Sequence, residues 1–133
     1  MNWFIAATKK YAVFSGRARR KEYWFFVLFN TLITWGLFIV QILVGFAMKE
    51  MGLVVGTLVT LYILAMIVPG LAVSSRRLHD IGRSAWWVLL SALPLIGPII
   101  VLTFLVRDSD PLANKYGPNP KGPPGQAPAA LPI

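Results

Sequence analysis

The sequence predicts an all-helical integral membrane protein with three transmembrane helices. Three stretches of the 133-residue chain, at 23–48, 51–75 and 84–106, contain no charged side chain. A helix rises about 1.5 Å per residue, so about 20 residues cross a hydrocarbon core of about 30 Å. Each stretch exceeds that length, and helices satisfy backbone hydrogen bonds internally, as lipid requires. Only 14% of the residues are charged, whereas soluble domains contain roughly 25%.

The first 14 residues predict an amphipathic helix lying in the membrane interface. At about 100° per residue, five apolar or aromatic side chains fall within one arc of roughly 100°, and Lys9 lies opposite that arc. The alternative is a frayed terminus with a chance run of aromatic residues. The members of the arc are Trp3, Phe4, Ala7, Tyr11 and Phe14.

Basic and aromatic residues mark the predicted membrane boundaries. A basic cluster precedes Tyr23 and Trp24 at the start of the first stretch, and Trp86 and Trp87 open the third. Charged groups stay with the lipid headgroups, and tyrosine and tryptophan rings favour the interface. We therefore expect these four aromatic residues to be interface anchors.

The second stretch is predicted to follow a tight hairpin at Lys49-Glu50. Small residues recur every four positions at Gly52, Gly56 and Thr60, a spacing that lets another helix approach closely. The alternative is chance, because glycine is common in membrane helices. Pro69-Gly70 should kink or end this helix, since proline removes a backbone donor.

The third stretch contains Pro94, Gly97 and Pro98 near its centre, so a straight helix is not expected there. A carbonyl freed in lipid needs a partner, so this part should face the other helices. Residues 1–120 are predicted to form a single membrane domain. Residues 121–133 are rich in proline and cannot bury a core, which predicts a disordered tail.

The distribution of basic residues predicts the orientation. With three spans, nine of the 13 lysines and arginines lie on the side of the N-terminus, which the positive-inside rule assigns to the cytoplasm. The hairpin and the tail would then lie outside. If the third stretch is instead re-entrant, the tail returns to the cytoplasm.

Two segments resemble the hallmark motifs of a bacterial family. Residues 14–24 (FSGRARRKEYW) and 76–87 (RRLHDIGRSAWW) are similar to motifs of the domain of unknown function 805 family, the YhaH-like small inner-membrane proteins. Residues 114–120 resemble its closing motif, and the similarity covers about residues 1–120. Ala85 departs mildly from the family, where glycine is common. The resemblance implies a multi-span protein of the bacterial inner membrane and no particular reaction.

The densest polar cluster follows the second stretch. In a helix, Asp80 would lie near Arg76 at i,i+4 and Arg83 at i,i+3, forming a small ion network. Arginine suits phosphate because its planar fork offers paired donors. We therefore expect a basic surface for anionic lipid or a partner; the alternative is that these residues only fix the topology. The candidate residues are Arg17, Arg19, Arg20, Arg76, Arg77, His79, Asp80 and Arg83.

Catalysis, metal binding and cofactor binding are not expected. His79 and Asp80 are adjacent, and neighbouring helical residues point about 100° apart, so Asp80 is poorly placed to orient the imidazole. One histidine and no cysteine leave few metal ligands. The chain contains no glycine-rich phosphate loop or dinucleotide-binding motif. The basic residues flank apolar spans, which favours anionic lipid over nucleic acid as the partner.

Two functions remain open. The first is a non-catalytic interaction, regulatory or structural protein of the inner membrane, in which arginines on the cytoplasmic face contact anionic lipid or a partner. The second is an oligomeric channel or transporter subunit that uses the broken third helix. No ionisable residue lies inside any predicted span, although proton and ion pathways usually contain one.

Overall fold

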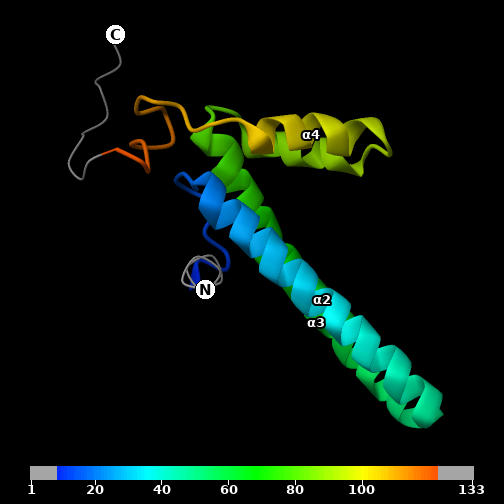
Figure 1. The fold of residues 1–133 in the computed structure, drawn as a ribbon. Helices are drawn as coiled ribbons and strands as arrows, with labels where there is room; N and C mark the ends of the chain where they lie inside the picture. Colours follow the sequence, from blue (N-terminus) through cyan, green and yellow to red (C-terminus); the bar gives the residue numbers. More distant parts are fainter. Residues whose placement is uncertain (1–8, 123–133) are drawn as a thin grey trace.

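The computed structural model describes residues 9–122, which form helices joined by short connections (Figure 1). The four helical elements are α2 (Arg20–Ala47), α3 (Lys49–Asp80), the 3₁₀ helix η1 (Ala85–Ala92) and α4 (Ile96–Val106). The predicted interfacial helix falls mostly outside the described residues, and so does all but the start of the predicted disordered tail.

Helices α2 and α3 form a long antiparallel hairpin. With 28 and 32 residues they are the two described helices that are long and apolar enough to cross a membrane, judged by length and composition. Their rise gives lengths of about 42 and about 48 Å. The chain reverses at the single residue Met48, whose backbone is extended.

The hairpin brings the backbones of α2 and α3 into close contact. A Cβ atom added to Gly52 would lie 2.5 Å from the Cα of Gly45, and one added to Gly56 would meet the side chain of Gln41. The Thr60 hydroxyl donates to the carbonyl of Gly56 within its own helix. Further along, the Tyr62 hydroxyl donates to Asn30 Oδ1 across the pair, at 2.9 Å. Gly52 and Gly56 therefore face α2 of the same chain, whereas Thr60 is exposed.

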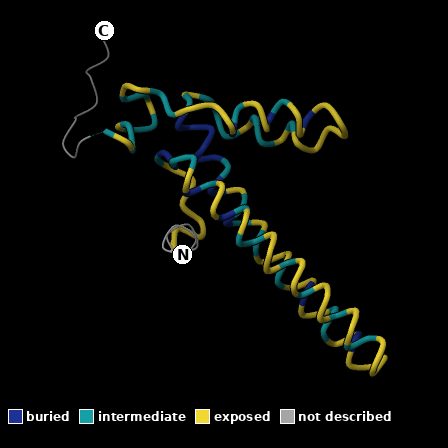
Figure 2. Tube along the Cα trace, viewed as in Figure 1, coloured by how far each residue is buried: buried dark blue, intermediate teal, exposed yellow. Residues whose placement is uncertain are grey.

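Apolar side chains cover the outside of this hairpin. Figure 2 shows exposed positions along most of α2 and α3. Among the described residues, Phe26 and Val73, with Tyr23 beside them, form a small buried apolar cluster. A soluble protein would bury such side chains, whereas a membrane helix exposes them to lipid.

Helix α3 continues through Pro69 to Asp80 instead of ending at the proline. Pro69 has no N–H for the carbonyl of Ala65, four residues earlier, so that carbonyl would lack its helical hydrogen bond. The Tyr11 hydroxyl donates to the Ala65 oxygen at 2.7 Å. A residue of the N-terminal segment thus supplies the donor that the proline removes.

The third apolar stretch, predicted as a span over 84–106 with a break near its prolines, consists of two short helices. Helix η1 ends at Ala92, the chain turns at 93–95, and α4 packs back against η1. Leu95 at the turn has a φ of 68°, a conformation rare for leucine. The physical reason for the break is the pair of prolines, which deny the backbone two helical donors within five residues.

Gly97 allows the two short helices to approach. A Cβ atom at this position would lie 1.6 Å from the carbonyl oxygen of Leu90 in η1, closer than any side chain tolerates. The 11 residues of α4 and the eight of η1 each extend about 16 Å. The resulting hairpin is therefore about half as long as a hydrocarbon core is thick.

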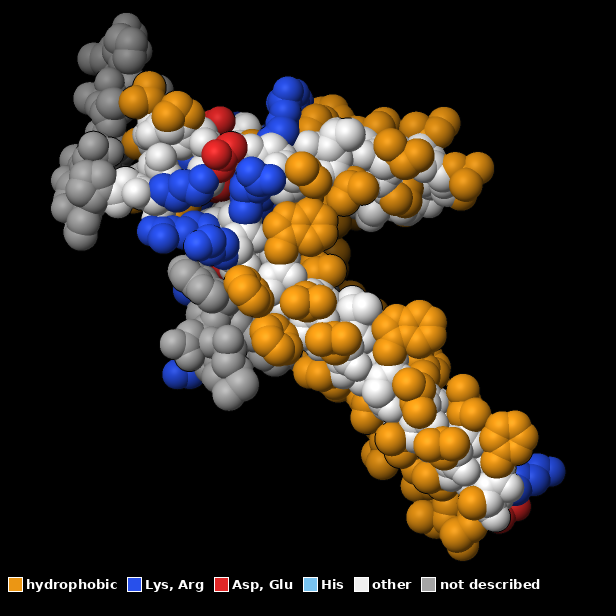
Figure 3. Space-filling view, in the orientation of Figure 1, with side chains coloured by type: hydrophobic (Ala, Val, Ile, Leu, Met, Phe, Trp, Pro, Cys, Tyr) orange, Lys and Arg blue, Asp and Glu red, His pale blue; other side chains and the backbone are white. Residues whose placement is uncertain are grey.

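The two hairpins leave one common end of the molecule and diverge (Figure 1). Figure 3 shows that charged side chains gather where the hairpins meet, whereas apolar side chains cover both arms. The exposed residues Lys49 and Glu50 lie at the far end of the long hairpin. Charged side chains thus gather at the two ends of the long hairpin, whereas apolar side chains cover the length of both arms.

Candidate functional site

A buried cluster of charged residues joins the N-terminal segment, the end of α3 and the chain after α4. We call this cluster the polar junction; its charged members are Arg17, Glu22, Arg76, Arg77 and Asp80. Helix α3 ends immediately after them in a Schellman motif, in which Arg83 N donates to Leu78 O at 2.9 Å and Gly82 N donates to His79 O at 3.1 Å. Gly82 provides the required left-handed backbone, with a φ of 71°.

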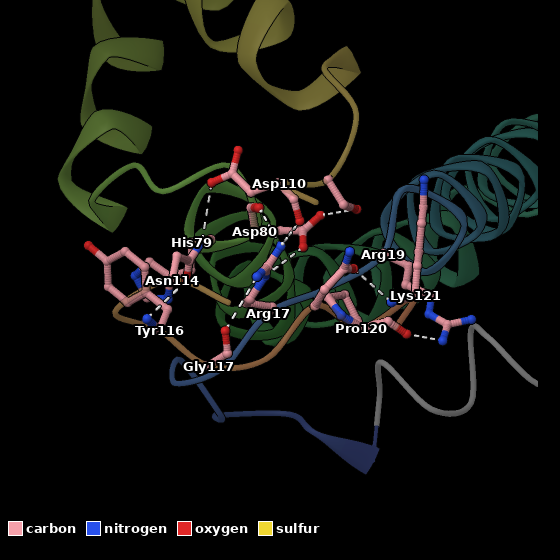
Figure 4. Close-up of polar contacts among 12 residues, drawn as sticks. Arg17, Arg19, His79, Asp80, Asp110, Asn114, Tyr116, Gly117, Pro120 and Lys121 are labelled. Carbon is pink, nitrogen blue, oxygen red and sulfur yellow. Dashed lines mark hydrogen bonds and ion pairs between the residues drawn. The ribbon is translucent and has the colours of Figure 1, made fainter. Parts of the chain in front are cut away.

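Arg17 uses all of its donors within the protein (Figure 4). Its Nε donates to Asp80 Oδ1 at 2.9 Å, and its Nη2 donates to the carbonyls of Asp80 and Asp110 at 3.0 and 2.8 Å. Its Nη1 donates to the carbonyls of Leu112 and Gly117 at 2.9 and 3.3 Å. A guanidinium group has five N–H donors, so none of them is left for an external ligand.

Asp80 lies at the centre of the polar junction and is fully buried. Its carboxylate accepts hydrogen bonds from Arg17, Arg77 and the Ser109 hydroxyl. Arg77, also fully buried, further donates to the carbonyls of Leu105 and Arg107 at the end of α4. The expected pairs of Asp80 with Arg76 and Arg83 are therefore wrong. Arg77, three residues before Asp80, and the distant Arg17 occupy the carboxylate oxygens of Asp80 instead.

Arg76 forms an ion pair with Glu22 instead, across from α3 to the first turn of α2. Its side chain is 1% exposed. Its Nε and Nη2 atoms are buried and find no hydrogen-bond acceptor among the described residues. The backbone carbonyl of Arg76 accepts a hydrogen bond from Ala18 N at 3.0 Å. Both contacts hold the N-terminal segment and the start of α2 against the end of α3.

His79 is buried against the chain that follows α4. Its ring stacks on that of Tyr116 with 3.8 Å between centroids, and its Nδ1 lies 3.3 Å from the carbonyl oxygen of Gly16. Asn114 Nδ2 donates to the His79 carbonyl at 2.9 Å. A reciprocal pair of backbone hydrogen bonds joins Asn114 and Gly117, which closes the turn that carries Tyr116.

The other candidate residues lie at the edge of the polar junction. Arg19 is partly exposed and donates to the carbonyl of Pro120, and Arg20 is partly exposed as well. Arg83 lies over the rings of Trp87 and Phe104, 5.2 and 5.0 Å from their centroids. These contacts attach the start of η1 to α4.

The predicted interface anchors have different surroundings. Trp86 is 77% exposed, whereas Trp87 packs edge-on against Phe104 of α4. Tyr23 and Trp24 contact each other edge-on, with 5.2 Å between centroids, and Tyr23 also packs against the small apolar cluster. All four side chains lie near the end where the hairpins meet.

The burial of three arginines corrects the prediction that they form a lipid-facing surface. Arg17, Arg76 and Arg77 are each at most 9% exposed, and their charges are paired with Asp80 and Glu22. Sequence reasoning overlooked Glu22, Ser109 and the carbonyls after α4. Two features of the sequence could have indicated these partners: the 114–120 motif, and the small number of carboxylates near so many basic residues.

The chemistry of this cluster is that of a structural connection. The Asp80 carboxylate is occupied by two guanidinium groups and a hydroxyl, and the His79 ring is held between Tyr116 and Gly16. Outside the cluster, exposed Lys121 and Asp108 form a surface ion pair. The hydrogen bond from Lys121 and one from Ser109 N lower the pKa of the Asp108 carboxyl.

Comparison with known proteins identifies the family. The model of the protein family of unknown function DUF805 matches residues 11–118. The chain belongs to the DUF805 family. It is 41% identical to the inner membrane protein YhaH of Escherichia coli (strain K12) over 121 residues. This alignment covers 91% of this chain and 98% of the relative. The chain is 39% identical to the inner membrane protein YhaI of the same organism, covering 91% and 97%. No solved structure matches the chain.

Membership of the DUF805 family confirms the predicted resemblance. The matched region includes the basic N-terminal motif, the end of α3 and residues 114–118 of the closing motif. The structure brings these three segments together in the polar junction. The relatives are named inner membrane proteins, in agreement with the apolar helices. The family description assigns no activity.

Proposed function

We propose that this DUF805 protein is a non-catalytic protein of the bacterial inner membrane that presents a basic cytoplasmic surface to anionic lipid headgroups. The observation that carries the proposal is the contact between the chain after α4 and the N-terminal segment. Arg17 donates to the carbonyls of Asp110, Leu112 and Gly117, and groups in such contact lie on one side of a membrane.

This contact supports a topology with two full spans and a re-entrant hairpin. Helices α2 and α3 cross the membrane, whereas η1 and α4 enter it and return to the same side. All but Lys49 of the 13 lysines and arginines then lie on one side, and the positive-inside rule assigns that side to the cytoplasm. Both ends of residues 9–122 would be cytoplasmic.

Site-specific labelling tests this topology, because the chain contains no cysteine. Leu112→Cys and Glu50→Cys would introduce thiols at two exposed positions at opposite ends of the fold. A membrane-impermeant maleimide should label Glu50→Cys in intact spheroplasts and Leu112→Cys only in inverted vesicles. Labelling of both thiols from the periplasmic side would refute the re-entrant hairpin and restore three spans.

The lipid contact depends on the basic residues that remain exposed, because the buried arginines have protein partners. Those flanking the polar junction include Lys10, Lys21 and Arg107. A basic residue near an anionic surface contributes on the order of 1 kcal/mol, and phosphate oxygens readily accept hydrogen bonds from arginine and lysine.

The test compares retention of phosphatidylglycerol with retention of phosphatidylcholine by the purified protein. Substituting Lys10, Lys21 and Arg107 together by glutamine should reduce retained phosphatidylglycerol several-fold. Lys49→Gln, at the other end of the long hairpin, is the matched control and should have little effect. Equal retention of both lipids by the wild-type protein would contradict the lipid contact.

A channel or transporter subunit is the second candidate, favoured by the break between η1 and α4. Discontinuous helices at membrane depth are a feature of channels and transporters, and the positive φ of Leu95 marks such a break. One chain offers few helices to enclose a path, so this function requires an oligomer. Ion or solute flux in proteoliposomes, together with an oligomer of defined size, would favour this candidate over the first.

A further inference from the structure

We infer that the η1–α4 hairpin makes this protein a wedge in the cytoplasmic leaflet, with a preference for membranes in which that leaflet is expanded by curvature. The inference rests on the proposed topology. It assigns to the hairpin a physical role that the contact with anionic lipid does not include.

The η1–α4 hairpin is too short to cross the membrane. The two helices of the hairpin have eight and 11 residues and extend about 16 Å, against about 30 Å for a hydrocarbon core. No orientation lets such a hairpin reach the far side. Figure 1 also shows it diverging from α2 and α3 instead of running along them, which reduces its depth further.

Both ends of the hairpin are held at the polar junction. Buried Arg77 donates to the carbonyls of Leu105 and Arg107, at the end of α4. Arg83 N, just before η1, donates to Leu78 O at 2.9 Å. Because both attachments lie at the end of α3, the hairpin cannot slide toward the opposite leaflet.

The hairpin has no polar face. Exposed apolar side chains occur on both helices and at the tip, whereas a helix that lies on a membrane surface needs a charged or polar face. The Ser91 and Thr103 hydroxyls donate to carbonyls of their own helices, so they offer no donor to headgroups. The exposed apolar residues are Trp86, Leu89, Leu93, Leu95, Ile96, Ile99, Leu102 and Val106.

With these features, the protein occupies more of the cytoplasmic leaflet than of the opposite leaflet. In the proposed topology all four described helices lie at cytoplasmic-leaflet depth, and of these α2 and α3 continue through the other leaflet. Apolar volume inserted into one leaflet expands that leaflet, and curvature that has already expanded the leaflet favours such insertion, as it does for helices that insert from the surface. The protein should therefore favour bilayers that are convex on their cytoplasmic face.

Orientation in reconstituted vesicles tests the wedge. Full-length Leu112→Cys protein would be reconstituted into small, highly curved vesicles and into large, nearly flat ones of the same phosphatidylcholine. The fraction labelled by impermeant maleimide before lysis measures the molecules whose cytoplasmic face points outward. We expect the ratio of outward to inward molecules to be about two-fold or more higher in small vesicles. Equal ratios would overturn the wedge.

A tip variant separates the wedge from other causes of orientation. Leu95→Asn with Ile96→Asn adds polar groups at residues that are 84% and 67% exposed, and asparagine accepts the positive φ of position 95. A polar tip should leave the leaflet core and remove most of the curvature preference. Leu43→Asn, on an exposed position of α2, is the matched control and should retain the preference.

The same vesicles distinguish failure of the wedge from failure of the topology. If Glu50→Cys and Leu112→Cys label on the same side, the re-entrant hairpin is wrong and the wedge fails with it. If they label on opposite sides while the orientation ratio is independent of vesicle size, only the wedge is refuted.

Discussion

Both hairpins are apolar and start from the same buried cluster, yet one is long enough to cross a membrane and the other is not. Helix α3 contains one proline, and the Tyr11 hydroxyl replaces the lost donor, so the helix continues. The second hairpin contains Pro94 and Pro98 around a turn, and Gly97 lets its helices double back. Hydropathy thus determines that a segment enters lipid, whereas backbone hydrogen bonding determines how far it extends.

Both hairpins depend on the polar junction, and its removal is predicted to have the largest effect. Asp80→Ala would leave Arg17 and Arg77 buried without their shared carboxylate. Removing one partner from a buried ion pair costs about 3–5 kcal/mol. The expected result is a large loss of stability in unfolding followed in detergent micelles.

The exposed pair of Asp108 and Lys121 provides the control for that experiment. Asp108→Asn removes a carboxylate at the surface, where water solvates the lysine that remains. Its unfolding curve should match that of the wild-type protein. If Asp80→Ala also matched the wild type, the polar junction would not hold the fold together.

Gly97→Ala should prevent the short hairpin from closing. Gly97→Ala places a Cβ where the Leu90 carbonyl oxygen lies, and overpacking of this kind costs typically about 1–3 kcal/mol. We expect faster proteolysis at the turn between η1 and α4. Gly36→Ala, with no neighbouring atom within 4 Å of the new Cβ, should be harmless. Equal proteolysis of both variants would contradict the close approach at Gly97.

In the long hairpin, Gly52→Ala should reduce stability more than Gly56→Ala. In Gly52→Ala the new Cβ meets the backbone of Gly45, whereas in Gly56→Ala it meets the movable end of the Gln41 side chain. We expect a loss of about 1–2 kcal/mol in the first variant and a smaller one in the second. Thermal unfolding in detergent measures both. A larger loss for Gly56→Ala would indicate a different contact face.

The smallest predicted effect concerns the donor that keeps α3 continuous. Tyr11→Phe should cost about 1 kcal/mol, because the carbonyl of Ala65 loses its hydrogen bond. In a Pro69→Ala background the helix supplies its own N–H, so the same substitution should cost less. A double-mutant cycle measures the coupling, and strictly additive losses would show that Tyr11 does not compensate for the proline.

Much of the fold could be predicted from the sequence, and the candidate site could be predicted only in part. The positions of α2 and α3 follow from charge-free length, and the break near Pro94 and Pro98 was expected. The residues of the polar junction were singled out, but their partners were not. Sequence spacing relates residues within one helix, whereas Arg17 and Asp80 are 63 positions apart.

The sequence by itself determined that this chain forms apolar helices flanked by basic residues, because hydrocarbon excludes charge and demands internal hydrogen bonds. The tertiary structure alone decided which arginines are buried and that the third segment turns back to the end at which α3 finishes. A buried arginine and a surface arginine look the same in a sequence. They differ only in whether distant carboxylates and carbonyls, here those of Asp80 and of residues 110–117, replace the water that each guanidinium loses.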